Sequence, residues 1–170
     1  MRKLALVFVT AALALPALAV AGSPPSPADA AAAQKQCAAE RTAMGATAFK
    51  LLYGNASNAF GKCVSRRASA NALNRAKAAA ACTTERNADP AAFAAKYGIG
   101  PNHKNAFVRC VQATAKAAAA AQVSATINAS KQCSAELKAD PAAFRAKYGP
   151  NTNKSNAFGK CVSTKVKHSS

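Results

Sequence analysis

Large apolar side chains are sparse along this chain and recur in short clusters between alanine-rich stretches. Phe93 and Tyr97 lie four residues apart, so a helix would place both rings on one face. Phe107, Cys110 and Val111 follow with the i, i+3, i+4 spacing of a second amphipathic helix. No segment shows the strict alternation of apolar and polar residues that is typical of a strand. The pattern therefore predicts a helical hairpin in which two apolar stripes face each other.

This cluster occurs three times. Residues 89–111 read DPAAFAAKYGIGPNHKNAFVRCV, residues 140–162 read DPAAFRAKYGPNTNKSNAFGKCV, and residues 46–64 read ATAFKLLYGNASNAFGKCV. The copies align on cysteine pairs that are 26, 28 and 28 residues apart. The first copy lacks the Asp-Pro pair, has Met44 and Gly45 there, and has a shorter turn. Such repeats are typical of arrays in which each unit contacts mainly its neighbours.

Local signals bound the helices of each unit. Asp89 and Asp140 are predicted N-caps, and the proline after each suits the first helical position. Gly98 and Gly149 are expected to end the short helices in a left-handed conformation. The asparagine before each AF pair is expected to cap the second helix of its unit, at Asn58, Asn105 and Asn156.

The stretches between the units contain neither proline nor glycine and are rich in alanine, so we expect helices there. If one helix spans the first join, Cys63 and Cys82 lie roughly 28 Å apart along it, which is beyond the reach of a disulfide. The same reasoning excludes a bond between Cys110 and Cys133. Pairing within units is the most economical remaining connectivity: Cys37 with Cys63, Cys82 with Cys110, and Cys133 with Cys161.

We therefore expect an all-α fold of three disulfide-stapled helical hairpin repeats joined by long Ala-rich helices. One unit has too few large apolar side chains to hold a hairpin alone, and closing a loop of this length removes roughly 3.5 kcal/mol of unfolded-chain entropy. The predicted segments are a signal peptide at 1–21, a Pro/Ala-rich N-terminal segment at 22–33, repeat 1 at 34–66, a joining helix at 67–78, repeat 2 at 79–112, an Ala-rich joining helix at 113–129, repeat 3 at 130–165 and a C-terminal tail at 166–170.

The N-terminal sequence MRKLALVFVTAALALPALAVAGS places Arg2 and Lys3 before an apolar run that ends in small residues. This is typical of a signal peptide, and we expect cleavage after Ala19 or Ala21. The alternative is an uncleaved membrane anchor, because the run approaches the length that spans a bilayer. Six cysteines, an even set, also suit export, because disulfides persist in oxidising compartments. We expect the protein to be secreted or associated with the cell envelope.

Positive charge is the strongest compositional feature. The chain has 23 Lys and Arg against 6 Asp and Glu, and removal of Arg2 and Lys3 with the signal peptide leaves a formal charge of +15. Bases spread along the joins and beside the cysteines suit contact with an anionic polymer, and the alternative is a surface that only confers solubility. The candidate contacts are Arg66, Arg67, Arg75, Lys77, Arg86, Lys96, Lys104, Arg109 and Lys116.

No group of residues predicts catalysis, a metal or another cofactor. No two cysteines are closer than 19 residues, so thiol redox chemistry is not expected. His103 aligns with Lys154 and so does not recur, which argues against zinc, and the Asn-rich loops lack the carboxylates that calcium needs. Glu40, Glu85 and Glu136 each follow a cysteine by three residues, and we expect them to form ion pairs within their own units.

The repeat ADPAAFxAKYG...NAFGKCV resembles that of short exported cysteine-pair helical repeat proteins of high-GC actinobacteria. The resemblance implies an exported, disulfide-stapled helical repeat and brings no activity or binding residues with it. From the residues we predict a noncatalytic cationic protein that is structural or binds anionic polymers, whether cell-wall or extracellular polyanions or nucleic acid without sequence preference. The alternatives are a membrane-active cationic protein and an enzyme with no recognisable motif.

Overall fold

The computed structural model describes residues 24–54, 57–149 and 156–168, and seven α-helices make up the fold of that part of the chain. They are α1 (Pro27–Met44), α2 (Ala46–Tyr53), α3 (Ala59–Ala88), α4 (Pro90–Tyr97), α5 (Ala106–Ala139), α6 (Pro141–Tyr148) and α7 (Ala157–His168). The predicted all-α class is confirmed. Residues 1–21, the predicted signal peptide, lie outside the described residues, and none of the described helices has the length and apolar character needed to cross a membrane.

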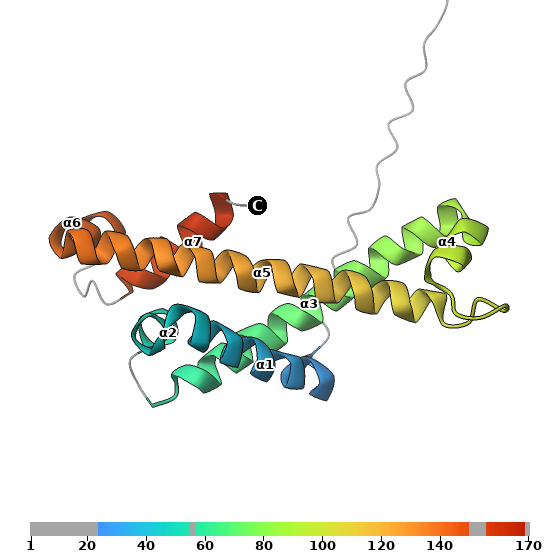
Figure 1. The fold of residues 1–170 in the computed structure, drawn as a ribbon, viewed down its shortest axis with the longest axis horizontal. Helices are drawn as coiled ribbons and strands as arrows, with labels where there is room; N and C mark the ends of the chain where they lie inside the picture. Colours follow the sequence, from blue (N-terminus) through green and yellow to red (C-terminus); the bar gives the residue numbers. More distant parts are fainter. Residues whose placement is uncertain (1–23, 55–56, 150–155, 169–170) are drawn as a thin grey trace, which may run out of the picture.

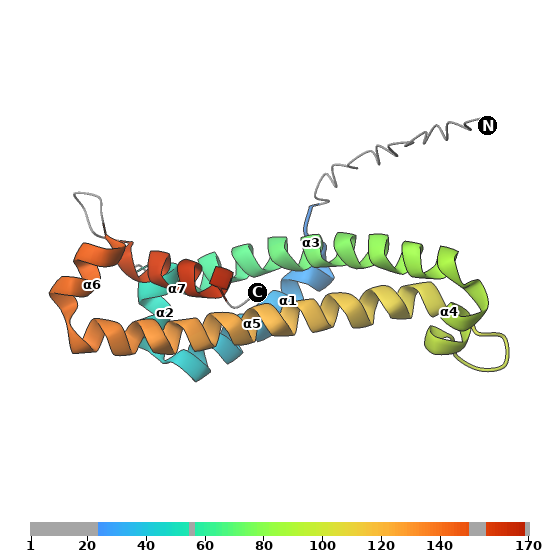
Figure 2. The same ribbon diagram turned by 90° about the horizontal axis from the view of Figure 1, so that it is seen from above.

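The long helices α3 and α5 lie side by side and run in opposite directions along the long axis of the molecule (Figure 1 and Figure 2). The short helix α4 lies at one end of this pair, and α6 lies at the other end with α7 (Figure 1). Unit 1 consists of α1, α2 and the start of α3. Unit 2 is formed by the end of α3, α4 and the start of α5, and unit 3 by the end of α5, α6 and α7.

The two predicted joins are helical throughout, as parts of α3 and α5. All three disulfides have the predicted partners, with Cα–Cα distances of 6.0, 6.1 and 6.1 Å. The ends of the chain are more helical than predicted. Helix α1 already begins at Pro27, within the expected N-terminal segment, and α7 continues to His168, within the expected tail.

Helices α4 and α6 begin as the sequence predicts, whereas the caps expected at Asn58 and Asn105 are not formed. Asp89 and Asp140 each accept a hydrogen bond at 2.9 Å from the backbone N–H three residues on. Asn58 and Asn105 do precede α3 and α5, but their side chains make no capping hydrogen bond. A capping side chain needs an extended backbone, whereas Asn58 has φ −96° and ψ 13° and Asn105 is left-handed at φ 60°.

The expectation of a left-handed conformation for the two glycines that follow α4 and α6 is also wrong. Gly98 has φ −72° and Gly149 has φ −117°, although both do end their helices. Gly98 is needed because a side chain would not fit at this position. A Cβ atom there would lie 2.5 Å from the Ala94 carbonyl oxygen and 2.5 Å from the His103 Cα, so only glycine allows the loop to fold back onto the helix.

The units do not form a linear array in which each contacts mainly its neighbours, so that prediction is wrong. Unit 2 has its own small core around Phe93 and the disulfide of that unit. The core of unit 3, around Phe144 and Phe158, instead includes Ala48 of α2 and packs against Met44 of α1. The antiparallel pairing of α3 with α5 returns the chain to its starting end, which places unit 3 beside unit 1.

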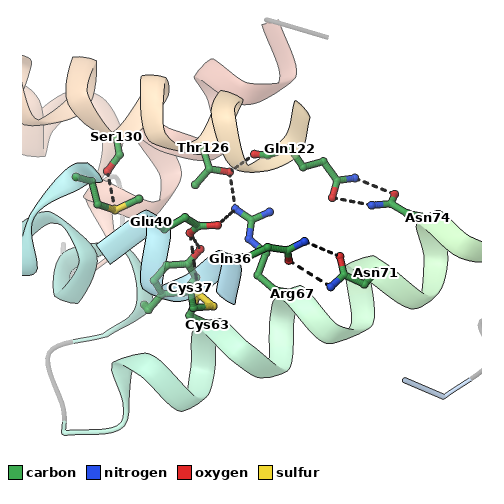
Figure 3. A network of polar contacts seen from close by, with 12 residues as sticks. Gln36, Cys37, Glu40, Cys63, Arg67, Asn71, Asn74, Gln122, Thr126 and Ser130 are labelled. Carbon is green, nitrogen blue, oxygen red and sulfur yellow. Dashed lines mark hydrogen bonds and ion pairs between the residues drawn. A yellow bond between two sulfur atoms is a disulfide. The ribbon is translucent and has the colours of Figure 1, made fainter. Parts of the chain in front are cut away.

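Polar side chains set the register where α1, α3 and α5 meet (Figure 3). Two amide hydrogen bonds of 3.2 Å join Asn71 to Gln36 of α1. Two more, of 3.2 and 3.1 Å, join Asn74 to Gln122 of α5. Both asparagines are buried, and each amide pair satisfies donor and acceptor together. Sliding one helix along another would leave these groups unpaired, so the pairs favour a single register.

Candidate anion-binding site

Each unit contains a glutamate that is hydrogen-bonded to the unit's tyrosine and ion-paired with a base. The tyrosine is the one that ends α2, α4 or α6, and it comes four residues after a phenylalanine that contacts its ring. The phenolic O–H donates to the carboxylate at 2.5 Å for Tyr53 and Glu40, 3.1 Å for Tyr97 and Glu85, and 3.0 Å for Tyr148 and Glu136. The tyrosine therefore ties the short helix to the helix that carries the glutamate.

The bases of these groups confirm ion pairs within units 2 and 3. Lys96 Nζ lies 2.8 Å from Glu85, and Lys165 Nζ lies 2.6 Å from Glu136. In unit 1 the partner is Arg67, one residue beyond the predicted end of that repeat, at 2.5 Å from Glu40. The ion pairs lower the pKa values of Glu85 and Glu136, chiefly through the hydrogen bonds that their lysines donate.

The unit 1 group differs because it is buried. Glu40 has no exposed surface, and Cys63 Sγ lies 4.0 Å from its Oε2 atom (Figure 3). Desolvation raises the pKa of Glu40, although the hydrogen bond from Tyr53 and the charge of Arg67 act in the opposite direction. Burial, followed by the Glu40 charge, raises the pKa of Tyr53 as well. Arg67 also donates to Thr126 of α5 at 2.9 Å, so one guanidinium links α1, α3 and α5.

Four of the nine predicted polymer contacts are engaged within the protein. Arg67 is held by Glu40 as described, and its side chain is 11% exposed. Arg75 lies 2.8 Å from the Asp29 carboxylate, and Lys96 is held by the glutamate of unit 2. The guanidinium of Arg86 lies 4.9 Å from the centroid of the Phe107 ring. Contacts within the protein therefore involve all four of these bases.

The other five predicted contacts are exposed, and the structure does not bring them together. Lys104 and Arg109 lie at the unit 2 end, and Lys77 lies in the middle of α3. Lys116 lines a separate furrow between α1 and α5. Only Arg66 lies at the end where units 1 and 3 meet. It joins three bases that the sequence analysis did not single out.

We call this place the basic hollow. It has a volume of about 480 Å³ and is formed by α2, α3, α6, α7 and the residue before α7. Arg66 comes from α3, Lys147 from α6, and Lys160 and Lys167 from α7. No acidic side chain is among its described lining residues. The remaining lining residues are Leu52, Tyr148, Asn156, Gly159, Ser163 and Thr164.

Two of the four cations of the basic hollow lie beside tyrosine rings. The Arg66 guanidinium lies 5.7 Å from the centroid of the Tyr53 ring, and Lys147 Nζ lies 5.0 Å from that of Tyr148. Lys147 is also ion-paired with Glu136 at 3.8 Å, and contact with Tyr148 and then with Glu136 raises the pKa of Lys147. The Lys147 side chain is therefore fully charged at neutral pH. Four cations in one concavity strengthen the local positive potential and attract anions.

Sequence reasoning missed three of the four bases for an identifiable reason. Lys160 occupies the position before the closing cysteine that Lys62 and Arg109 occupy in the other units, and Lys147 aligns with Lys96. Recurrence alone does not show which copy forms a site. Arg66 reaches α7 only because unit 1 packs on unit 3, and this contact joins segments about a hundred residues apart.

Comparisons with protein-family models, with curated proteins and with solved structures find no match to this chain. The resemblance to exported cysteine-pair repeats therefore stays a prediction. Within the described residues, no group of three or more His, Cys, Asp or Glu side chains is placed to hold a metal ion. The chemistry that the basic hollow offers is the binding of anionic groups by cations and by neutral hydrogen-bond donors.

Proposed function

We propose that this protein is an exported, noncatalytic binder of anionic polymers, and that the basic hollow is its main contact. The observation that carries the proposal is the convergence of four basic side chains from three helices on one concavity. These polymers include cell-wall and extracellular polyanions, and nucleic acid bound without regard to sequence. The three disulfides support export, because such bonds persist in oxidising compartments.

The physical basis is the release of counterions. A polymer with closely spaced negative charges holds condensed cations, and each protein cation that replaces one contributes to binding through their release. Arginine can donate two parallel hydrogen bonds to a phosphate, sulfate or carboxylate group, while lysine acts as a point charge. Ser163 and Thr164 add hydroxyl donors beside the cations. The hollow can thus hold one anionic group while the exposed bases elsewhere attract its neighbours along the polymer.

Two triple variants with equal loss of charge test this proposal. In the first, Arg66, Lys160 and Lys167 of the hollow are each changed to Gln. In the second, the exposed bases Lys77, Lys104 and Arg109 are changed to Gln. Binding to heparin, teichoic acid and duplex DNA is measured by titration over a range of salt concentrations, with helicity and disulfide mapping as checks of folding.

We expect the hollow variant to lose at least tenfold more affinity than the control variant for all three polymers. For duplex DNA, the slope of log K against log salt should become shallower by about 0.9 for each direct contact removed, so by about 2 to 3 in the hollow variant. Equal losses in both variants would refute the hollow as the contact. Binding that does not depend on salt would refute the mechanism. Leakage from anionic vesicles would instead favour the membrane-active alternative.

A further inference from the structure

A second concavity, which we call the furrow, runs between α1 and α5 above α3, with a volume of about 620 Å³. Its walls are mainly methyl groups, among them those of Ala32 and Ala39 on α1 and of Ala115, Ala119 and Val123 on α5. Alanine side chains end one carbon from the backbone, so the facing helices leave space that longer side chains would fill. The basic hollow and the furrow have no described lining residue in common.

The polar groups on the floor of the furrow are already paired within the protein. The Asn71 side chain donates to the Asp29 carbonyl oxygen and exchanges two hydrogen bonds with Gln36. The Asp29 carboxylate, the one acidic group among the described lining residues, is held by Arg75 at 2.8 Å and by the Ser26 hydroxyl at 2.6 Å. A ligand in the furrow therefore meets apolar surface and need not supply hydrogen bonds to these groups.

Two cations on the walls of the furrow lack a partner within the described part of the chain. Lys35 on α1 and Lys116 on α5 are exposed and line opposite walls, which places positive charge on both sides of the furrow. The ligand that suits these features has one negative head group and an apolar body. This combination differs from the basic hollow, where four cations and two hydroxyl groups are among the lining residues.

The shape of the furrow favours an elongated apolar body. Its lining runs from Val111 to Ser124 along α5, which is roughly 20 Å at the rise of a helix. A volume of about 620 Å³ spread over this length suits one elongated ligand, such as a single extended alkyl chain. Another copy of this strongly cationic chain would be repelled by the lysines.

We propose that the furrow binds a single-chain anionic amphiphile, with the alkyl chain along the alanine walls and the acidic head group between Lys35 and Lys116. Its volume lies within the range of small-ligand sites, which are also largely apolar with a few polar groups that fix orientation. The proposal goes beyond polymer binding and uses a different surface of the molecule.

The test uses fatty acids of increasing length, from decanoate to palmitate, which compete with a dansyl-labelled fatty acid below their micellar concentrations. Ala32→Phe and Ala120→Phe each place a ring in the furrow. The matched controls Ala31→Phe and Ala117→Phe alter exposed alanines of the same helices outside it. All four alanines are exposed, so the variants should fold, and helicity and disulfide mapping check this directly.

We expect the furrow variants to weaken palmitate binding at least tenfold and the controls to leave it within twofold. Affinity should rise with chain length, by up to about fifteenfold for every two methylenes that are fully buried. Changing both Lys35 and Lys116 to Gln should weaken palmitate several-fold and leave neutral dodecyl maltoside unchanged. Heparin binding should be unaffected by the alanine variants, which separates this test from that of the hollow.

Three results would overturn the proposal. One is equal palmitate binding in the furrow and control variants. Another is affinity that does not depend on chain length. The third is a different occupant: either an acidic amphipathic peptide that displaces palmitate and is itself blocked by Ala120→Phe, or self-association that this substitution abolishes.

Discussion

Removal of the guanidinium from the buried group of unit 1 should destabilise the protein strongly. In Arg67→Met the Glu40 carboxylate would keep the hydrogen bond from Tyr53 but lose its cation at a position with no exposed surface. Breaking a buried ion pair in this way typically costs about 3 to 5 kcal/mol. Protonation of Glu40 limits the cost. Because burial already raises the pKa of Glu40, taking up a proton at pH 7 costs less than the roughly 3.4 kcal/mol that it would cost at the ordinary pKa of 4.5.

The matched variant is Lys96→Met, which removes the cation from the exposed group of unit 2, where the lysine side chain is 61% exposed. Urea unfolding followed by circular dichroism gives the free energy of unfolding of both variants at pH 7 and pH 5. We expect Arg67→Met to lose up to about 3 kcal/mol at pH 7 and less than about 1 kcal/mol at pH 5, because protonating Glu40 then costs less. Lys96→Met should barely move the urea midpoint.

Equal losses of unfolding free energy in the two variants would show that burial does not decide how much these ion pairs contribute to stability. A loss in Arg67→Met that is the same at both pH values would show that the cost does not come from an unpaired carboxylate. In that case the lost contact with Thr126, or a packing defect, would be the cause.

Three further predictions follow from named contacts. Burial raises the pKa of Glu40, so this carboxyl group stabilises the folded state most at pH values below its ordinary pKa of 4.5. Its contribution to stability should fall as the pH rises through the raised pKa. Glu40→Gln should remove this fall from a pH series of urea midpoints. Replacing Cys82 and Cys110 with Ser should release α4 and lower hydrogen-exchange protection there while units 1 and 3 keep theirs, because unit 2 has a separate core. Gly98→Ala should lower stability by about 1 to 3 kcal/mol, since the new methyl group overlaps backbone atoms, and an unchanged thermal midpoint would contradict this.

Local structure was largely predictable from the sequence. The starts of α4 and α6 follow from Asp-Pro pairs, and the continuity of α3 and α5 follows from long stretches without proline or glycine. Once those helices are continuous, distance excludes Cys63–Cys82 and Cys110–Cys133, and pairing within units is the most economical of the remaining connectivities. These features depend on residues close in sequence, or on simple helix geometry.

The tertiary arrangement was not predictable in the same way. The packing of unit 1 on unit 3 depends on the antiparallel pairing of α3 with α5. Alanine-rich helices have a weak hydrophobic pattern, which does not indicate which other helix they pack against. The amide pairs that fix the register involve Asn71 and Asn74, which look like ordinary polar helix residues in the sequence. The role of the tyrosines also needed the structure, because their spacing from phenylalanine indicates a shared face and says nothing of the glutamate.

We propose that anionic polymers bind where unit 1 meets unit 3. The most direct test is a titration of the isotope-labelled protein with a short heparin oligosaccharide, followed by nuclear magnetic resonance of the backbone amides. We expect the largest shifts on Arg66 and on α7 between Lys160 and Lys167, with little change around Lys104 in unit 2. Shifts centred on unit 2, or spread evenly over every exposed base, would contradict it.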